Sequence, residues 1–151
     1  MKIAIGSDHA GFPLKQALLP HLKALGHQVE DVGAYNAEPS DYPLFAEKVS
    51  EKVATHQAEM GIAICGNGIG MSIAANKVPG VRAALCLTEQ MAYQTRSHND
   101  SNVLCLAGRD LPIETNMKLV DIWLTTPFGH IERHARRVNE IQEIEKAHLK
   151  L

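Results

Sequence analysis

The chain has 151 residues, a formal net charge of −2 and 45% hydrophobic residues. This length suits one domain with a substantial core, and we expect a single domain over residues 1–151. The near-neutral charge argues against a nucleic-acid footprint or an anionic membrane surface, so any bound anion would be held by local geometry.

Cysteine usage and the first residues bear on the compartment. Cys65, Cys86 and Cys105 lie in apolar surroundings, without the spacing of a metal site or a disulfide framework. They suit a reducing compartment. The apolar segment within residues 1–6 is too short for a signal peptide. No later apolar run reaches the 18 residues that a membrane-spanning helix needs. The sequence therefore predicts a cytoplasmic protein.

A predicted strand over residues 2–6 opens the chain and runs directly into a turn and a helix. Residues 12–25 carry apolar side chains at helical spacing, and Gly26 stands where this helix is expected to end. Asp8 and His9 therefore lie between a strand and a helix, a position from which Asp8 is also able to cap the helix.

The next segment combines a half-exposed strand, predicted over residues 27–33, with a loop over residues 34–43 that holds turn formers throughout. We expect this loop to form part of a rim. A second helix follows, with apolar residues on one side. Asp41, just before it, is expected to be its N-cap and not a catalytic group.

Residues 60–76 are the most informative stretch of the chain. The apolar run at residues 62–64 is bounded by glycines, which is the pattern of a central parallel strand covered on both faces. Helix formers begin at Met71, so three glycines lie at a strand-to-helix turn: Gly66, Gly68 and Gly70. Backbone N–H groups in such a turn can point outward and bind an anion.

Cys65 stands at the carboxyl end of this strand, beside the expected helix N-terminus. That position favours a reactive thiolate and predicts a nucleophile or base next to an anion hole. The alternatives are an ordinary glycine-rich turn and a small buried hydrophobe. A P-loop is excluded because no Gly-Lys-Ser/Thr follows. A dinucleotide site is disfavoured because Met71 stands where the third glycine should fall.

The second half of the chain continues the alternation of strands and helices. We expect strands over residues 81–87 and 103–108, and helices over residues 89–96, 112–124 and 131–151. Thr88 is expected to cap the first of these helices. The last helix is charged, with Val138, Ile141 and Ile144 on one face, and we expect it to pack on a partner subunit.

Five strands alternating with helices predict an α/β protein with a Rossmann-like three-layer fold, a five-stranded parallel sheet and an extra C-terminal helix. In such a sheet, the loops at the carboxyl ends of the strands face one crevice. Asp8, His9 and Cys65 lie on loops of this kind. We expect a third polar group, His98 with Asn99, to converge with them.

Several motifs point to one family at separate places along the chain. They are Gly-Ser-Asp-His-Ala-Gly at residues 6–11, Asp-Tyr-Pro at 41–43, Cys-Gly-x-Gly-x-Gly at 65–70, Ala-Asn-Lys-x-Pro-Gly-Val-Arg at 75–82, His-Asn-Asp-x-Asn-Val at 98–103 and Arg-His-x-x-Arg-Val at 133–138. With these motifs, the chain resembles the type B ribose-5-phosphate isomerases from residue 2 to about residue 144.

The resemblance implies an aldose–ketose isomerase that acts on a phosphorylated pentose without a metal or cofactor. It also implies a homodimer or a dimer of dimers with sites between subunits. Moving a carbonyl between C1 and C2 needs a base for the C2 proton, donors for the enediolate oxygens, and an acid–base pair that opens the sugar ring.

The same resemblance assigns roles to individual residues. Cys65 would be the base. The enediolate would be stabilised by the backbone N–H groups of Gly66, Asn67, Gly68, Ile69 and Gly70. His98, with Asp8, would open the ring, a task that suits an imidazole near neutral pH. Asn99 would hydrogen-bond substrate hydroxyls.

The substrate phosphate would be held by four residues: His9, Arg109, Arg133 and Arg137. Guanidinium groups suit phosphate, and the last two arginines are four residues apart and so share one helix face. The alternative for that pair is a solvated basic face. We expect solvation of their neighbours, Arg136 and His134.

One position departs from the family pattern. Asn67 stands where Thr or Ser is usual, but an amide also donates hydrogen bonds, so we expect function to survive. The departure leaves the substrate open, because relatives isomerise galactose 6-phosphate or allose 6-phosphate. The segments around His98 and Arg133 favour the pentose. The competing class is a non-catalytic flavodoxin-like phosphate- or nucleotide-binding module in which Cys65 is only structural.

Overall fold

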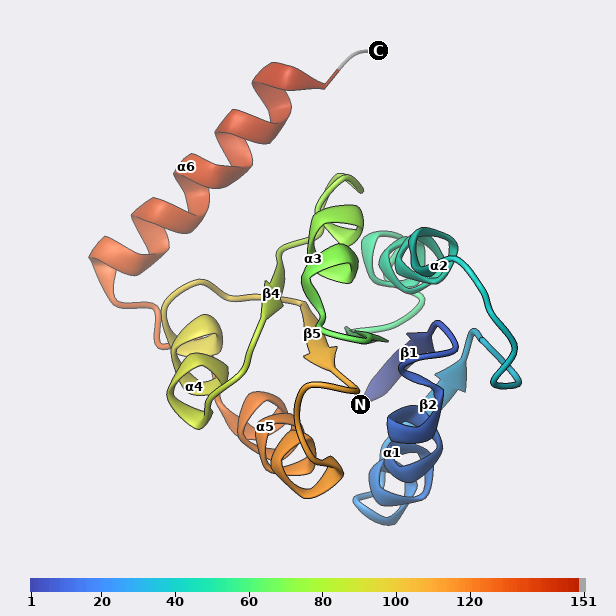
Figure 1. Ribbon diagram of the computed structural model, residues 1–151. Helices are drawn as coiled ribbons and strands as arrows, with labels where there is room; N and C mark the ends of the chain where they lie inside the picture. Colours follow the sequence, from blue (N-terminus) through green and yellow to red (C-terminus); the bar gives the residue numbers. More distant parts are fainter. Residues whose placement is uncertain (150–151) are drawn as a thin grey trace.

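The computed structural model describes residues 1–149 and shows an α/β fold built on one parallel sheet (Figure 1). Its strands are β1 (Lys2–Ser7), β2 (Gln28–Asp31), β3 (Met60–Cys65), β4 (Ala83–Leu85) and β5 (Val103–Ala107). Its helices are α1 (Phe12–Ala24), α2 (Tyr42–Ala54), α3 (Ile69–Ala75), α4 (Glu89–Ser97), α5 (Ile113–Thr125) and α6 (Glu132–His148). All strand pairs are parallel, in the order β2-β1-β3-β5-β4, which confirms the predicted fold.

Two apolar layers cover the sheet, one on each face. Helices α1, α4 and α5 pack on one face, and α2 and α3 pack on the other (Figure 1). Strand β3 lies at the centre, and its side chains alternate between the layers: Ile62 and Ile64 join the first, Ala63 and Cys65 the second. The apolar run of this strand follows from its burial on both faces.

The sheet topology opens a crevice between β1 and β3. These strands are hydrogen-bonded neighbours, but the chain leaves β1 toward α1 on one face and leaves β3 toward α3 on the other. A ligand site is expected outside the carboxyl ends of the strands at such a switch point. Asp8 and Cys65 lie at these two strand ends.

Element boundaries differ from the sequence prediction where side chains replace strand pairing. Strand β4 spans only Ala83–Leu85, against the predicted residues 81–87. At its first residue, the side chain of Asn76 bonds the N–H and C=O of Ala83 at 2.8 and 2.9 Å. Thr88 caps α4 as predicted, accepting from Met91 N at 3.1 Å. Asp41 occupies the N-cap position of α2, but its carboxylate makes no capping bond.

Helix α6 lies outside the three layers, near α4 (Figure 1). Its Val138 is buried, whereas Ile141 and Ile144 remain 45% and 63% exposed. The packing on a partner predicted for this helix is not represented in a single chain. The predicted helix extends to residue 151, and its last two residues lie outside the described range. Over residues 1–149, none of the helices combines the length and apolar character that a membrane span requires.

Candidate active site

A cavity of about 430 Å³ opens at the carboxyl ends of β1 and β3. It is lined by Asp8, His9, Ala10, Tyr42, Cys65, Gly66, Asn67, Ile69, Gly70, Ile73 and Arg109. The N-terminal polar pair, the cysteine and the glycine loop therefore meet within one chain. Arg109, which follows β5, joins them.

Cys65 is buried, and its sulfur accepts a backbone hydrogen bond. Its residue is 4% exposed, and its Sγ accepts the backbone N–H of Gly68 at 3.2 Å. This peptide N–H holds the sulfur against the glycine loop, and the thiolate is the form in which a cysteine acts as a base or nucleophile. The predicted arrangement of a thiol beside a strand-to-helix turn is thus present.

The other two cysteines have a different environment. Cys86 and Cys105 are buried free thiols within the apolar layers. Burial raises the pKa of the Cys86 thiol to about 12, and burial first, then the neighbouring Cys65 and Cys86, raises the pKa of Cys105 still further. These two sulfurs remain protonated at neutral pH and act as small core side chains.

The glycine loop needs glycine for two separate reasons. Gly68 has φ +78°, and a Cβ there would lie 2.4 Å from Leu85 Cδ1. A Cβ at Gly70 would lie 2.5 Å from the ring of Tyr42. The first position needs a left-handed backbone conformation, and the second needs space for an aromatic ring.

Asn67 closes the loop with its own side chain. Its Oδ1 accepts the N–H of Ile69 at 3.0 Å, which leaves the Nδ2 group as the donor of this exposed side chain. The N–H groups of Gly68 and Ile69, two of the five predicted to form the anion hole, are thus already used inside the loop.

Asp8 and His9 are both fixed by neighbouring backbone groups. Asp8 Oδ1 accepts from Gly11 N at 3.0 Å, which fixes the turn before α1. The N-cap of α1 is Gly11 and the helix has no side-chain cap, so Asp8 does not cap it. His9 Nδ1 accepts from Ser40 N at 3.1 Å, and Ser40 Oγ accepts from His9 N at the same distance. Because Nδ1 is an acceptor, the neutral ring carries its proton on Nε2, which is left as a donor.

Arg109 is locked to the glycine loop through its backbone. Its N–H donates to Gly66 O at 2.9 Å, so the ends of β3 and β5 are held in one register. The guanidinium supplies a permanent positive charge at the cavity. Among residues 1–149, no group of three His, Cys, Asp or Glu side chains is placed to hold a metal ion.

The third polar group lies elsewhere in the chain. His98 caps the C-terminus of α4 and leads into β5, so it stands at the amino ends of the strands. At about 3.3 Å per residue, the five residues of β5 separate the two ends of the sheet by ~16 Å. The expected convergence of His98 and Asn99 with Cys65 therefore does not occur within one chain.

A second group of predicted site residues lies around His98. Its ring stacks on that of His134 with centroids 4.2 Å apart. Arg133 and Arg137, one helical turn apart on α6, flank His134 and are exposed. Asn99 lines a separate cavity of about 520 Å³ between β4 and α6. We call His98, Asn99, Arg133 and Arg137 the amino-end group.

His134 differs from its prediction. It was expected to be solvated, but it is only 6% exposed, because the first turns of α6 fold against the end of α4. Its Nδ1 has no hydrogen-bond partner within the described residues. Burial, then the charges of His98, Arg133 and Arg137, lower the pKa of His134. The expectation for Arg136 holds, since it is exposed and pairs with Glu132 at 2.8 Å.

Sequence reasoning gave no role to Ser40 and Tyr42, which both belong to the site. Ser40 sets the orientation of His9, and Tyr42 packs on Gly70 and lines the cavity. Tyr42 had a signal in the Asp-Tyr-Pro motif. Ser40 had none, because its backbone N–H and its hydroxyl reach His9 across 31 residues of sequence.

Comparison with known proteins places this arrangement in a family. The family model described as Ribose/Galactose Isomerase matches residues 3–141. The chain belongs to this family. Ribose-5-phosphate isomerase B of Escherichia coli strain K12 is 43% identical to this chain over 145 residues. The match covers 96% of this chain and 97% of the relative.

Solved structures of ribose/galactose isomerases agree with this membership. Ribose-5-phosphate isomerase B of Clostridium thermocellum is 48% identical with a TM-score of 0.96, covering 99% of this chain and 100% of that chain. The Mycoplasma genitalium enzyme with bound ribulose-5-phosphate is 43% identical with a TM-score of 0.91, covering 96% of both chains. The resemblance to type B ribose-5-phosphate isomerases is therefore confirmed.

Proposed function

We propose that this chain interconverts ribose 5-phosphate and ribulose 5-phosphate through an enediolate. The observation that carries the proposal is the Cys65 sulfur, hydrogen-bonded by Gly68 N–H in a cavity that also holds Asp8, His9 and Arg109. A non-catalytic binding module has no need of a thiolate placed in this way. The relatives named ribose-5-phosphate isomerase B support the pentose substrate.

The proton transfer follows from the cavity. The Cys65 thiolate removes the proton from C2, and the C2–H electron pair forms the C1–C2 double bond. The π pair of the C1 carbonyl moves onto O1 at the same time, which gives the enediolate. The proton then goes to C1, while O2 loses a hydrogen and O1 gains one. Asn67 Nδ2 and backbone N–H groups of the loop stabilise the developing charge on the oxygens.

Ring opening and phosphate binding require the amino-end group. We assign ring opening to His98, with Asp8, and hydroxyl recognition to Asn99. His9 donates Nε2–H to the phosphate, and Arg109, Arg133 and Arg137 supply positive charge. Arg133 and Arg137 are exposed, and neither has an ion-pair partner within residues 1–149, which leaves their charge for an anion.

A homodimer explains how the two groups serve one substrate. Within one chain they lie at opposite ends of the strands, so a second chain must bring its amino-end group to the Cys65 cavity. In a two-fold dimer, what each chain gives to its partner's site is returned at the other site. The exposed Ile141 and Ile144 of α6 supply apolar surface for such contact, as a homodimer or a dimer of dimers.

The chemistry also fits a reducing compartment. A thiolate base is lost when its sulfur is oxidised, and all three cysteines are free thiols. We therefore assign the protein to the cytoplasm, where ribose 5-phosphate turnover belongs to pentose phosphate metabolism.

The test is a substrate panel with purified protein in a chelator-containing buffer. We expect conversion of ribose 5-phosphate to ribulose 5-phosphate, and slower or no conversion of allose 6-phosphate and galactose 6-phosphate. Faster conversion of either hexose phosphate would make that hexose phosphate the substrate, an alternative that the unusual Asn67 leaves open. Absence of all three conversions, from protein whose folding is confirmed by circular dichroism, would favour a binding module.

A further inference from the structure

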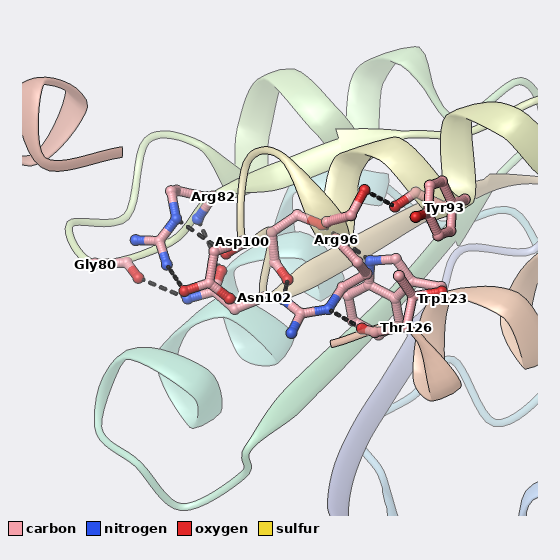
Figure 2. A network of polar contacts seen from close by, with 10 residues as sticks. Gly80, Arg82, Tyr93, Arg96, Asp100, Asn102, Trp123 and Thr126 are labelled. Carbon is pink, nitrogen blue, oxygen red and sulfur yellow. Dashed lines mark hydrogen bonds and ion pairs between the residues drawn. The ribbon is translucent and has the colours of Figure 1, made fainter. Parts of the chain in front are cut away.

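The segment that carries His98 and Asn99 is fastened by a network of side chains (Figure 2). Its centre is Arg96, in the last turn of α4 and 7% exposed. Arg96 Nη1 donates to Asp100 Oδ1 at 2.8 Å and to Ser101 O at 2.5 Å. A single guanidinium thus spans the loop on which His98 lies.

Asp100 holds the same loop from the other side. Its φ is +49°, a left-handed conformation that is uncommon outside glycine and that aspartate tolerates better than most residues. Its Oδ2 accepts from Arg82 Nη2 at 3.4 Å, and its backbone O accepts from Arg82 Nε at 3.0 Å. Arg82 in turn is fixed to Asn102, whose Oδ1 accepts its N–H at 2.8 Å (Figure 2). Asp100 therefore sits between two arginines from different segments.

The same guanidinium reaches the connection to α6. Arg96 Nε donates to Thr126 O at 3.3 Å, just after α5 ends (Figure 2). The chain from Thr126 leads directly to Arg133 and to His134, whose ring stacks on His98. Arg96 therefore contacts both segments of the amino-end group. One segment carries His98 and Asn99, and the other leads to the start of α6.

Stability alone gives a weak reason for this network. Arg96 is buried but the Asp100 side chain is 35% exposed, and neither a buried nor an exposed ion pair reliably adds stability. Its position offers a stronger reason, because Arg96 and Asp100 each lie two residues from His98. We propose that Arg96 and Asp100 are positioning residues that hold the amino-end group in the geometry needed for ring opening and phosphate binding. The proposal rests on the isomerase function proposed above.

The two residues should have different kinetic signatures. Asp100→Asn loosens only the loop of His98, so kcat should fall ~10-fold or more while KM stays within ~3-fold, since small misplacement of a reacting group is costly. Arg96→Lys also releases Thr126 and the start of α6, so it should lower kcat and raise KM for ribose 5-phosphate together.

The chain offers a matched control. Glu132 and Arg136 form another carboxylate–guanidinium pair at i,i+4 spacing, with 76% and 52% of their side chains exposed. Glu132→Gln and Arg136→Lys repeat the same chemical changes outside the network. Their kcat and KM should match wild type, whereas equal losses in the control pair would show a nonspecific charge effect and overturn the proposal.

A spectroscopic measurement makes the test independent of activity. Trp123, the single tryptophan, donates Nε1–H to Ser101 Oγ at 2.9 Å, so its indole N–H signal reports on the network. In NMR spectra, Asp100→Asn should shift this signal and the ring signals of His98, and Glu132→Gln should shift neither. If Arg96→Lys fails to fold, the kinetics and NMR spectra of Asp100→Asn still test the positioning role.

The outcomes separate this proposal from the proposed function. An inactive wild type with His98 displaced only in the network variants would refute the isomerase assignment and keep the positioning role. An active wild type with unchanged kcat, KM and His98 signals in Asp100→Asn would refute the positioning role and keep the isomerase.

Discussion

The cavity around Cys65 and the amino-end group around His98 are built in different ways. In the first, the donors are backbone N–H groups: Gly68 N–H on the sulfur, Ser40 N–H on His9, and Arg109 N–H on Gly66. Side chains hold the second, through Arg96 and Asp100. The cavity should therefore keep its shape through most side-chain substitutions, whereas the amino-end group should be sensitive to single ones.

The comparison also shows what sheet topology imposes on a site. A loop that follows a strand and a loop that precedes one lie at opposite ends of a parallel sheet, so Cys65 and His98 cannot meet in one chain. The predicted order of elements already places His98 between a helix and a strand, so the expected convergence with Cys65 overlooked which end of the sheet that loop occupies. If one substrate needs both the Cys65 cavity and the amino-end group, the site must be shared between two chains.

The largest expected effect concerns the cavity. Cys65→Ala should lower kcat by ~10²–10⁴-fold, the usual result of removing an acid–base group, while KM stays close to wild type because the phosphate contacts remain. Cys105→Ala is the matched control, since that buried thiol stays protonated. Near-normal turnover in folded Cys65→Ala, measured by a coupled ribulose 5-phosphate assay, would remove Cys65 from the mechanism.

A smaller effect is expected at Asn67. If its amide stabilises the enediolate, Asn67→Ala should lower kcat ~10-fold or more and raise KM less, and Asn67→Thr should be tolerated. Asn67→Asp separates the two roles of this side chain, because it keeps an acceptor for Ile69 N–H and loses the donor. Wild-type kinetics in Asn67→Ala would show that the residue only shapes the turn.

Much of the fold was predictable because burial leaves a direct trace in sequence. The apolar run of β3 and the helical spacing in α1 placed the sheet and the crevice, and with them Asp8 and Cys65. The start of β4 was not predictable, since the Asn76 side chain that bonds its first residue, Ala83, lies seven residues away. Burial of His134 was also missed, because it depends on how α6 meets α4.

The smallest effect is a pH dependence of stability at His134. Its pKa is lowered from 6.5 in the folded chain, so the unfolded chain binds the proton more readily. Protonation of His134 therefore favours the unfolded chain. The folded chain has its full stability with respect to this group above about pH 6.5 and loses stability as the pH falls below that value. The pKa of His27 is also lowered, by burial and then by the N-terminal ammonium group, and acts in the same direction.

His134→Leu should therefore reduce the loss of stability on acidification without abolishing it. The measurement is the urea midpoint at pH 7.5 and pH 5.5 in both proteins, with His27→Leu as a comparison at a site far from α6. Equal midpoint differences in wild type and His134→Leu would contradict the buried, proton-excluding environment described for this ring.

The central claim, that one site combines two chains, is tested most directly by mixing variants. Cys65→Ala and Arg137→Ala, each nearly inactive, are co-expressed with different tags, and the mixed dimer is verified by mass. It would hold one site with both defects and one with neither, so random assortment should restore about one quarter of wild-type activity. Activity no greater than that of the two parent proteins combined would place Arg137 in its own chain's site and contradict the shared arrangement.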